Sequence, residues 1–180
     1  TITSRCTPIY FPKLKNNEIE EYLKMIDSNN LYNFEISKIS NGSITEAILL
    51  SNDYQQNMEI LSSIIRTIIA KDIKNTNEVL KHFRDKNSSI RLLNLLNIFF
   101  RSILTDNMDF QNMNGLLENI KFQYKDTNWE SCILLVNNTQ NYILKNGNIE
   151  LMITSLFFEI KKILNQEYHN INIVEDYLNY

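Results

Sequence analysis

Apolar and polar residues alternate with a helical period along most of this chain of 180 residues. Apolar side chains recur every three or four positions, which places them on one face of an α-helix. Short clusters of Asn, Ser and Asp interrupt this pattern, and the chain has only 3 glycines and 2 prolines to break helices elsewhere. The pattern predicts an all-α protein after a short N-terminal stretch.

The first twelve residues do not share the helical pattern. Thr1, Ile2 and Thr3 favour extended backbone. Pro8 and Pro12 each push the preceding residue away from helical geometry. We therefore predict a short extended segment, and because the chain starts inside it without a methionine, we expect a piece of a larger protein.

Three short helices are predicted next. The first covers residues 18–27 and begins at Asn17, with a glutamate three positions later as its capping partner. The second covers residues 31–40 and stops at Gly42, and Ser43 caps the third. The apolar positions of the second helix are Leu31, Phe34, Ile36 and Ile39. These helices predict a compact three-helix module with a small core.

Longer helices are predicted from residue 53 onward. They cover residues 54–72, 77–83, 90–104, 116–122, 128–144 and 149–165, with a short turn near 174–178. The four-residue turn at 145–148 makes the last two helices an antiparallel hairpin.

The helix at 90–104 is apolar nearly all round, which is typical of a central core helix or of an interface. Its candidate partner-interface residues are Leu92, Leu95, Phe99 and Ile103. The core and interface alternatives both remain open on the sequence alone.

Charge and cysteine content narrow the function classes. The net charge is −3, and Lys and Arg do not cluster, which argues against direct binding of a nucleic-acid backbone by this fragment. Cys6 and Cys132 are far apart in the sequence, as expected for a reduced, cytoplasmic protein. No apolar run is long enough to span a membrane.

Motifs of catalysis are missing from the sequence. There is no glycine-rich phosphate-binding loop. His82 and His169 have no ligand-type residue at metal-site spacing. Cys132 lies in an apolar run, where a structural cysteine is more common than a nucleophile. We expect no cofactor, no metal and no catalysis by this fragment alone.

Ser4-Arg5-Cys6 follows a Thr-Ile pair and precedes an aromatic-Pro-x-Leu step. This motif resembles the end of the ATPase core in the clamp-loader AAA+ family. The resemblance implies that Arg5, with Ser4 and Cys6 as its motif, acts in trans as an arginine finger at a neighbouring subunit's ATP site. A guanidinium suits the charge that develops on the γ-phosphate. The alternative is a surface arginine beside a small apolar cysteine.

A second motif follows in the family's order. Gly42-Ser43-Ile44-Thr45-Glu46-Ala47 resembles the opening of the last lid helix in clamp-loader subunits. Subunits that hydrolyse ATP have an arginine two residues after the serine, where this chain has Thr45. The chain therefore resembles a non-hydrolysing subunit of the bacterial DNA polymerase III clamp loader.

This resemblance implies three parts: the end of the ATPase core at residues 1–12, a helical lid at 13–52 and a helical collar for oligomerisation at 53–180. The implied partners are the ATPase subunits and the delta subunit. Contact with the sliding clamp and DNA would come only through the assembly, and no membrane partner is expected. Alternatives are an ATP-hydrolysing clamp-loader subunit, a eukaryotic small replication-factor-C subunit, or a free-standing helical protein-interaction domain.

Overall fold

A computed structural model describes residues 12–70, 76–105, 110 and 113–166. Within these residues all regular secondary structure is helical, which confirms the predicted all-α class. The chain divides into two compact units, Thr1–Tyr54 and Gln55–Tyr180. Residues 1–11 of the predicted extended segment and the predicted turn near 174–178 lie outside the described residues.

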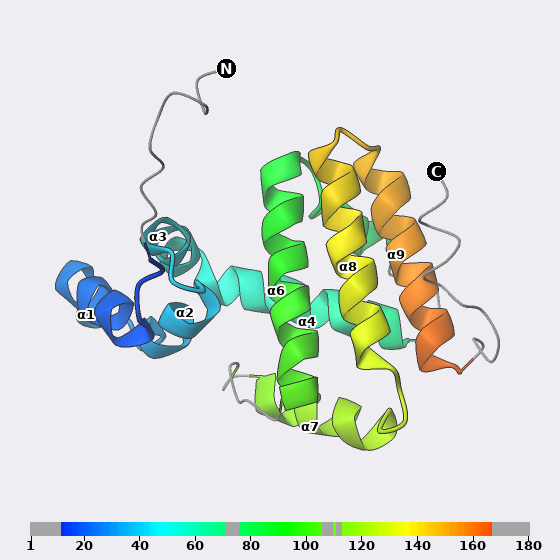
Figure 1. The fold of residues 1–180 in the computed structure, drawn as a ribbon, viewed down its shortest axis with the longest axis horizontal. Helices are drawn as coiled ribbons and strands as arrows, with labels where there is room; N and C mark the ends of the chain where they lie inside the picture. The colour runs from blue at the N-terminus through cyan, green and yellow to red at the C-terminus, as the bar shows by residue number, and fades with distance from the viewer. Residues whose placement is uncertain (1–11, 71–75, 106–109, 111–112, 167–180) are drawn as a thin grey trace. The chain divides into compact units, whose positions relative to one another are not determined.

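The first unit contains three short helices, as predicted: α1 (Asn16–Ile26), α2 (Asn33–Ile39) and α3 (Ile44–Asn52). Each of the three contacts the other two (Figure 1). Their shared core consists of Ile19, Leu23, Ile36, Ile39, Ala47, Leu50 and Tyr54. This interior is small, so each buried contact carries a large share of the stability of the unit.

Helix α1 begins earlier than its sequence pattern predicts. The carboxylate of Glu18 accepts the backbone N–H of Lys15 at 2.7 Å, which closes the first turn. Glu20 instead forms an ion pair with Lys24 at 2.6 Å on the helix surface. The predicted capping pair of Asn17 and Glu20 is therefore wrong, because Glu18 reaches the free N–H group at the helix start.

Helix α2 begins at Asn33, two residues later than predicted. Leu31 precedes the helix and is 90% exposed, and Phe34 is about half exposed. The buried polar side chains of the helix are Asn33, Glu35 and Ser37. Ile36 and Ile39 are buried as predicted. The predicted helix start at Leu31 is wrong because a turn precedes Asn33, in which the N–H of Tyr32 donates to the side-chain oxygen of Asn30 at 3.0 Å.

The turn between α2 and α3 requires a glycine. Gly42 has φ +86°, in the left-handed region that residues with a Cβ rarely adopt. A Cβ on Gly42 would lie 2.6 Å from the Cβ of Lys13, and the Gly42 carbonyl accepts the N–H of Leu14 at 3.2 Å. The Ser43 side chain then accepts the N–H of Glu46 at 3.3 Å, which confirms Ser43 as the N-cap of α3.

The second unit is a larger helical bundle. Its helices are α4 (Tyr54–Ile69, which begins with the last residue of the first unit), α5 (Thr76–Leu80), α6 (Lys86–Thr105), α7 (Asn114–Gln123), α8 (Trp129–Leu144) and α9 (Ile149–Leu164). Helices α6, α8 and α9 lie side by side with α8 in the middle, and α4 crosses behind them (Figure 1). Ile65 and Ile68 of α4 line a small cavity with Phe99, Phe100 and Trp129. The crossing of α4 thus closes one side of this bundle.

Two pairs of side-chain amides join α6 to α8. Asn97 donates to Asn137 and Gln140 donates to Asn94, both at 2.6 Å. The residue numbers rise along one helix as they fall along the other, so α6 and α8 are antiparallel. These hydrogen bonds fix the register of two helices that are far apart in the sequence.

Helices α8 and α9 form the predicted hairpin. Asn146 adopts φ 66°, and the N–H of Gly147 donates to the carbonyl of Tyr142 at 2.9 Å. Asn148 then caps α9 by accepting the N–H of Leu151 at 3.0 Å. The local sequence alone specifies this turn.

Candidate functional site

The arginine-finger motif cannot be placed in the fold, because Ser4, Arg5 and Cys6 lie outside the described residues. Their role remains a prediction from the sequence. The second motif lies within the described residues. Thr45 is exposed on the first turn of α3, and Ala47 is fully buried. A small residue at position 47 lets α3 pack closely in the core of the first unit.

The four candidate interface residues of α6 are inside the bundle. Leu92, Leu95, Phe99 and Ile103 are 4%, 1%, 0% and 7% exposed. Phe99 packs against Phe110 with ring centroids 5.9 Å apart. This burial favours the alternative in which α6 is a central core helix. A partner role for these four side chains remains a prediction that their exposure does not support.

A buried polar cluster lies in the first unit. The Tyr54 hydroxyl donates a short hydrogen bond to the carboxylate of Glu35, and both side chains are buried. The ring of Tyr32 packs against that of Tyr54 with centroids 4.8 Å apart. Burial, followed by the hydrogen bond and negative charge of Glu35, raises the pKa of the Tyr54 hydroxyl far above its ordinary value of 10.0. Tyr54 therefore stays protonated and acts as a hydrogen-bond donor.

The hydrogen bond between Tyr54 and Glu35 stabilises the first unit. A general acid or base must reach the atom whose proton it transfers. The Tyr54 hydroxyl instead points to a carboxylate that is itself buried. The sequence carries one signal of this arrangement: Glu35 lies four residues before Ile39, on the face that Ile39 turns to the core. The partner at position 54 leaves no comparable signal in the local pattern.

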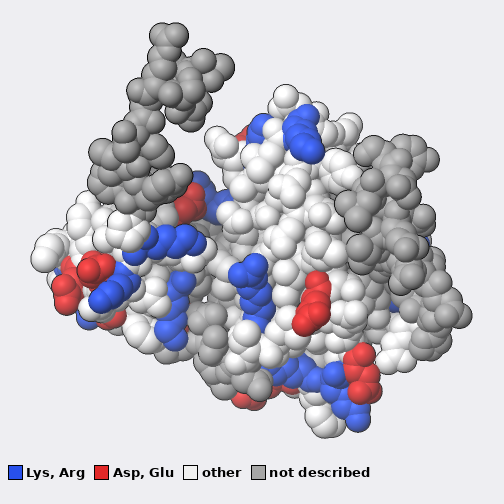
Figure 2. Space-filling view, in the orientation of Figure 1, with Lys and Arg blue, Asp and Glu red and all other residues white. Residues whose placement is uncertain are grey.

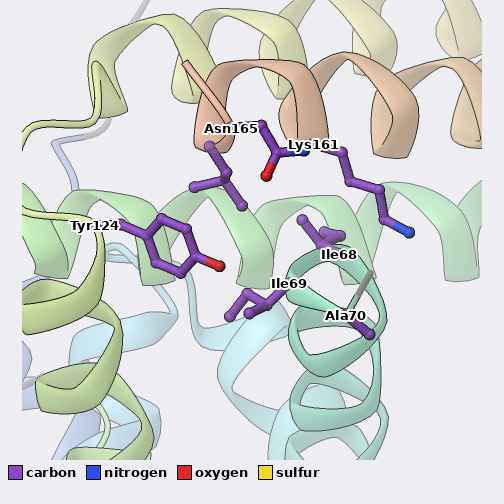
Figure 3. Close-up of a pocket in the computed structure, with 7 residues that line it drawn as sticks. Ile68, Ile69, Ala70, Tyr124, Lys161 and Asn165 are labelled. Carbon is purple, nitrogen blue, oxygen red and sulfur yellow. The ribbon is translucent and has the colours of Figure 1, made fainter. Parts of the chain in front are cut away.

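The second unit contains a pocket of about 300 Å³ where three helices end (Figure 3). Its lining consists of Ile68, Ile69, Ala70, Tyr124, Lys161, Leu164 and Asn165. The hydroxyl of Tyr124 points into the pocket, whereas Lys161 extends away from it along the edge (Figure 3). The pocket therefore has an apolar floor and a polar rim.

The ends of α4, α7 and α9 give this pocket its electrostatic character. The last carbonyl groups of a helix carry a partial negative charge, which favours cations and hydrogen-bond donors. Lys161 supplies one cation in the last turn of α9. Burial raises the pKa of the Tyr124 hydroxyl, which keeps it a donor. Among the described lining residues, no nucleophile lies beside a base.

The remaining candidate for reactivity is Cys132. Its side chain is fully buried in α8, and burial raises the pKa of the thiol to about 12. The thiol is therefore protonated near neutral pH, which disfavours the nucleophilic alternative for Cys132. In the part of the chain that the structure describes, no three His, Cys, Asp or Glu side chains gather in a way that could hold a metal ion. None of the described helices is long and apolar enough to cross a membrane.

Comparison of the chain with models of protein families, with curated proteins and with solved structures found no match. Inferences about function therefore depend on the sequence motifs and on the described geometry.

Proposed function

We propose that this chain is the C-terminal part of a delta-prime subunit of a bacterial DNA polymerase III clamp loader. In this role it assembles with the ATPase subunits and the delta subunit during loading of the sliding clamp in DNA replication. It would not hydrolyse ATP, but would donate Arg5 to the ATP site of a neighbouring subunit. The proposal assigns residues 13–52 to the lid and 53–180 to the collar.

One observation carries the proposal: two family-like motifs occur in the family's order, and one of them has a specific departure. Ser4-Arg5-Cys6 precedes the Gly42-Ser43 turn, and Thr45 stands where ATP-hydrolysing subunits have an arginine. This combination fits a subunit that donates an arginine to its neighbour and does not sense its own nucleotide. Thr45 argues against the alternative of an ATP-hydrolysing subunit.

The described geometry is consistent with this proposal. Gly42 adopts a backbone conformation that favours glycine, Ser43 caps α3 and Ala47 is fully buried. Each motif residue thus has a physical reason for its identity. A three-helix unit followed by a larger helical bundle is also compatible with a lid and a collar.

The experiment is an Arg5→Ala substitution in the complete protein, reconstituted with the ATPase subunits, the delta subunit, the sliding clamp and primed DNA. We expect the assembly to form normally and its DNA-stimulated ATP hydrolysis to slow. Loss of an arginine finger costs on the order of a thousandfold at the affected site, but the effect on the whole complex should be smaller because other ATP sites remain.

Arg66→Ala is the matched control, because Arg66 is an exposed arginine of α4 outside the motif. It should leave both assembly and ATP hydrolysis unchanged. Normal ATP hydrolysis and clamp loading by the Arg5→Ala protein would contradict the proposal. If the protein upstream of Thr1 contained no ATPase core, the alternative of a free-standing helical interaction domain would replace it.

A further inference from the structure

All 3 glycines of this chain follow an asparagine, in the pairs Asn41-Gly42, Asn114-Gly115 and Asn146-Gly147. An asparagine before a glycine readily loses its side-chain amide group without an enzyme, because glycine has no side chain to hinder attack by its own backbone nitrogen. The structure holds the three pairs in different ways. These differences determine which pair can react while the chain is folded.

The reaction forms a five-membered ring that includes the main chain. The backbone nitrogen of the glycine forms a bond to Cγ of the asparagine, and the side-chain nitrogen leaves as ammonia after taking up the proton of the glycine N–H. Water then opens this succinimide ring at either of its two carbonyl groups, which gives aspartate or isoaspartate. The two reacting atoms must first be brought together by rotation of the asparagine backbone. Contacts that hold the glycine N–H therefore oppose the reaction.

The pair Asn146-Gly147 is held at both reacting groups. The N–H of Gly147 donates to the carbonyl of Tyr142 at 2.9 Å. The ammonium group of Lys86 donates to the side-chain oxygen of Asn146 at 3.3 Å and to the carbonyl of Leu144 at 2.7 Å. Lys or Arg side chains are visible in Figure 2 at this end of the second unit, where Figure 1 places the α8–α9 turn. Rotation towards the ring would break these contacts.

The pair Asn114-Gly115 lies in the first turn of α7. The helical backbone fixes the nitrogen of Gly115 relative to the side chain of Asn114. The side-chain oxygen of Asn114 is also buried, so water has poor access to the carbon that must react. Both features oppose conversion of this pair in the folded chain.

The pair Asn41-Gly42 is held at neither reacting group. The side chain of Asn41 is exposed, and among the described residues none accepts a hydrogen bond from the N–H of Gly42. The carbonyl of Gly42 accepts the N–H of Leu14 at 3.2 Å, but this carbonyl belongs to the next peptide unit. The attacking nitrogen therefore loses no hydrogen bond when the backbone of Asn41 rotates.

We propose that Asn41-Gly42 is a site of spontaneous succinimide formation in the folded chain, and that its conversion to isoaspartate loosens the first unit. Isoaspartate adds one methylene group to the main chain and a negative charge to the side group. The extra length falls between α2 and Ser43, the N-cap of α3, and displaces the carbonyl that Leu14 contacts. This inference depends only on the geometry of the turn and does not require the clamp-loader assignment.

The test is incubation of the chain of 180 residues at mildly alkaline pH, followed by digestion and mass spectrometry of the peptides. A parallel sample in guanidinium chloride gives the rate of conversion of each asparagine in the unfolded chain. The unfolded rate divided by the folded rate is the protection factor of that site. We expect the protection factor of Asn146 to exceed that of Asn41 at least about tenfold, which corresponds to roughly 1.4 kcal/mol of contacts. The protection factor of Asn114 should exceed that of Asn41 as well.

Asn41→Gln is the matched variant, because a glutamine must form a six-membered ring, which is slower. Hydrogen exchange measured on aged samples should show loss of protection in α2 and α3 of the unmodified chain and retained protection in the Asn41→Gln chain. Asn146→Gln is the control with the same substitution in the other unit. Its α2 and α3 should lose protection with age as they do in the unmodified chain.

Two results would overturn the inference. One is a protection factor at Asn41 that equals or exceeds that at Asn146, or a folded chain in which neither asparagine converts. The other is an aged unmodified chain whose α2 and α3 show the same protection as those of the aged Asn41→Gln chain, since conversion at Asn41 would then not loosen the first unit.

Discussion

The interior of the first unit contains a carboxylate and a phenol, whereas the buried polar side chains described in the second unit are all uncharged. In the first unit, three short helices share few apolar residues, and Glu35 and Tyr54 join helices across the core. In the second unit, longer helices bury aromatic and aliphatic side chains, including the pairs Phe83–Phe157 and Phe100–Trp129. A small core can thus gain a specific arrangement from one polar contact, while a larger one depends on apolar packing.

The largest expected effect is on the second unit. Leu95→Glu places a charge where the side chain is 1% exposed, and an unpaired buried charge costs several kcal/mol. We expect loss of the cooperative unfolding transition of the bundle, measured by circular dichroism in urea. Leu104→Glu is the control on the same helix, because Leu104 is 44% exposed and should change stability by about 0.5 kcal/mol or less. Equal effects of the two substitutions would show that α6 is not a core helix.

An intermediate effect is expected in the first unit. Tyr54→Phe removes the hydroxyl that donates to Glu35 and should cost about 1–3 kcal/mol, because the buried carboxylate loses a donor. Hydrogen exchange measured by mass spectrometry should show lower protection in α1, α2 and α3, with little change in α8 and α9. Tyr22→Phe, at a partly exposed position of α1, should leave protection unchanged. Unchanged protection in the Tyr54→Phe protein would show that the hydrogen bond between Tyr54 and Glu35 does not stabilise the first unit.

A pair of glycine substitutions should have effects of opposite sign in the two units, the smaller of them in the second unit. Gly42→Ala should destabilise the first unit by about 1–3 kcal/mol, because the backbone is left-handed there and the new methyl group meets Lys13. Gly115→Ala should stabilise the second unit by about 0.5–1 kcal/mol, because Gly115 lies in α7 with open space around the new methyl group. Urea denaturation of both variants measures these changes. Two changes of the same sign would refute this contrast between the units.

The sequence predicted those elements that local chemistry specifies. The α8–α9 hairpin follows from Gly147 and from the cap at Asn148, whose partners are within a few residues. Asn128 likewise caps α8 by accepting the N–H of Ser131 at 3.1 Å. Such contacts depend on spacing along the chain, and spacing is visible in a sequence.

The sequence could not predict features that depend on distant partners. Glu35 and Tyr54 are 19 residues apart, so the helical period of the apolar residues did not indicate their buried hydrogen bond. Periodicity also could not distinguish a central helix from an interface helix in α6, since both are apolar all round. The pocket where α4, α7 and α9 end was missed for the same reason, because its lining comes from three separate segments.

The burial of Cys132 makes this thiol a reporter of how often the bundle opens. Because burial raises the pKa of this thiol to about 12, almost all of it is protonated and unreactive at pH 8. Exposure of the unfolded thiol would restore ordinary reactivity, so a thiol reagent should label Cys132 at a rate governed by transient opening of α8. With Cys6 replaced by serine, the labelling rate would report the population of the opened bundle under native conditions, without any denaturant.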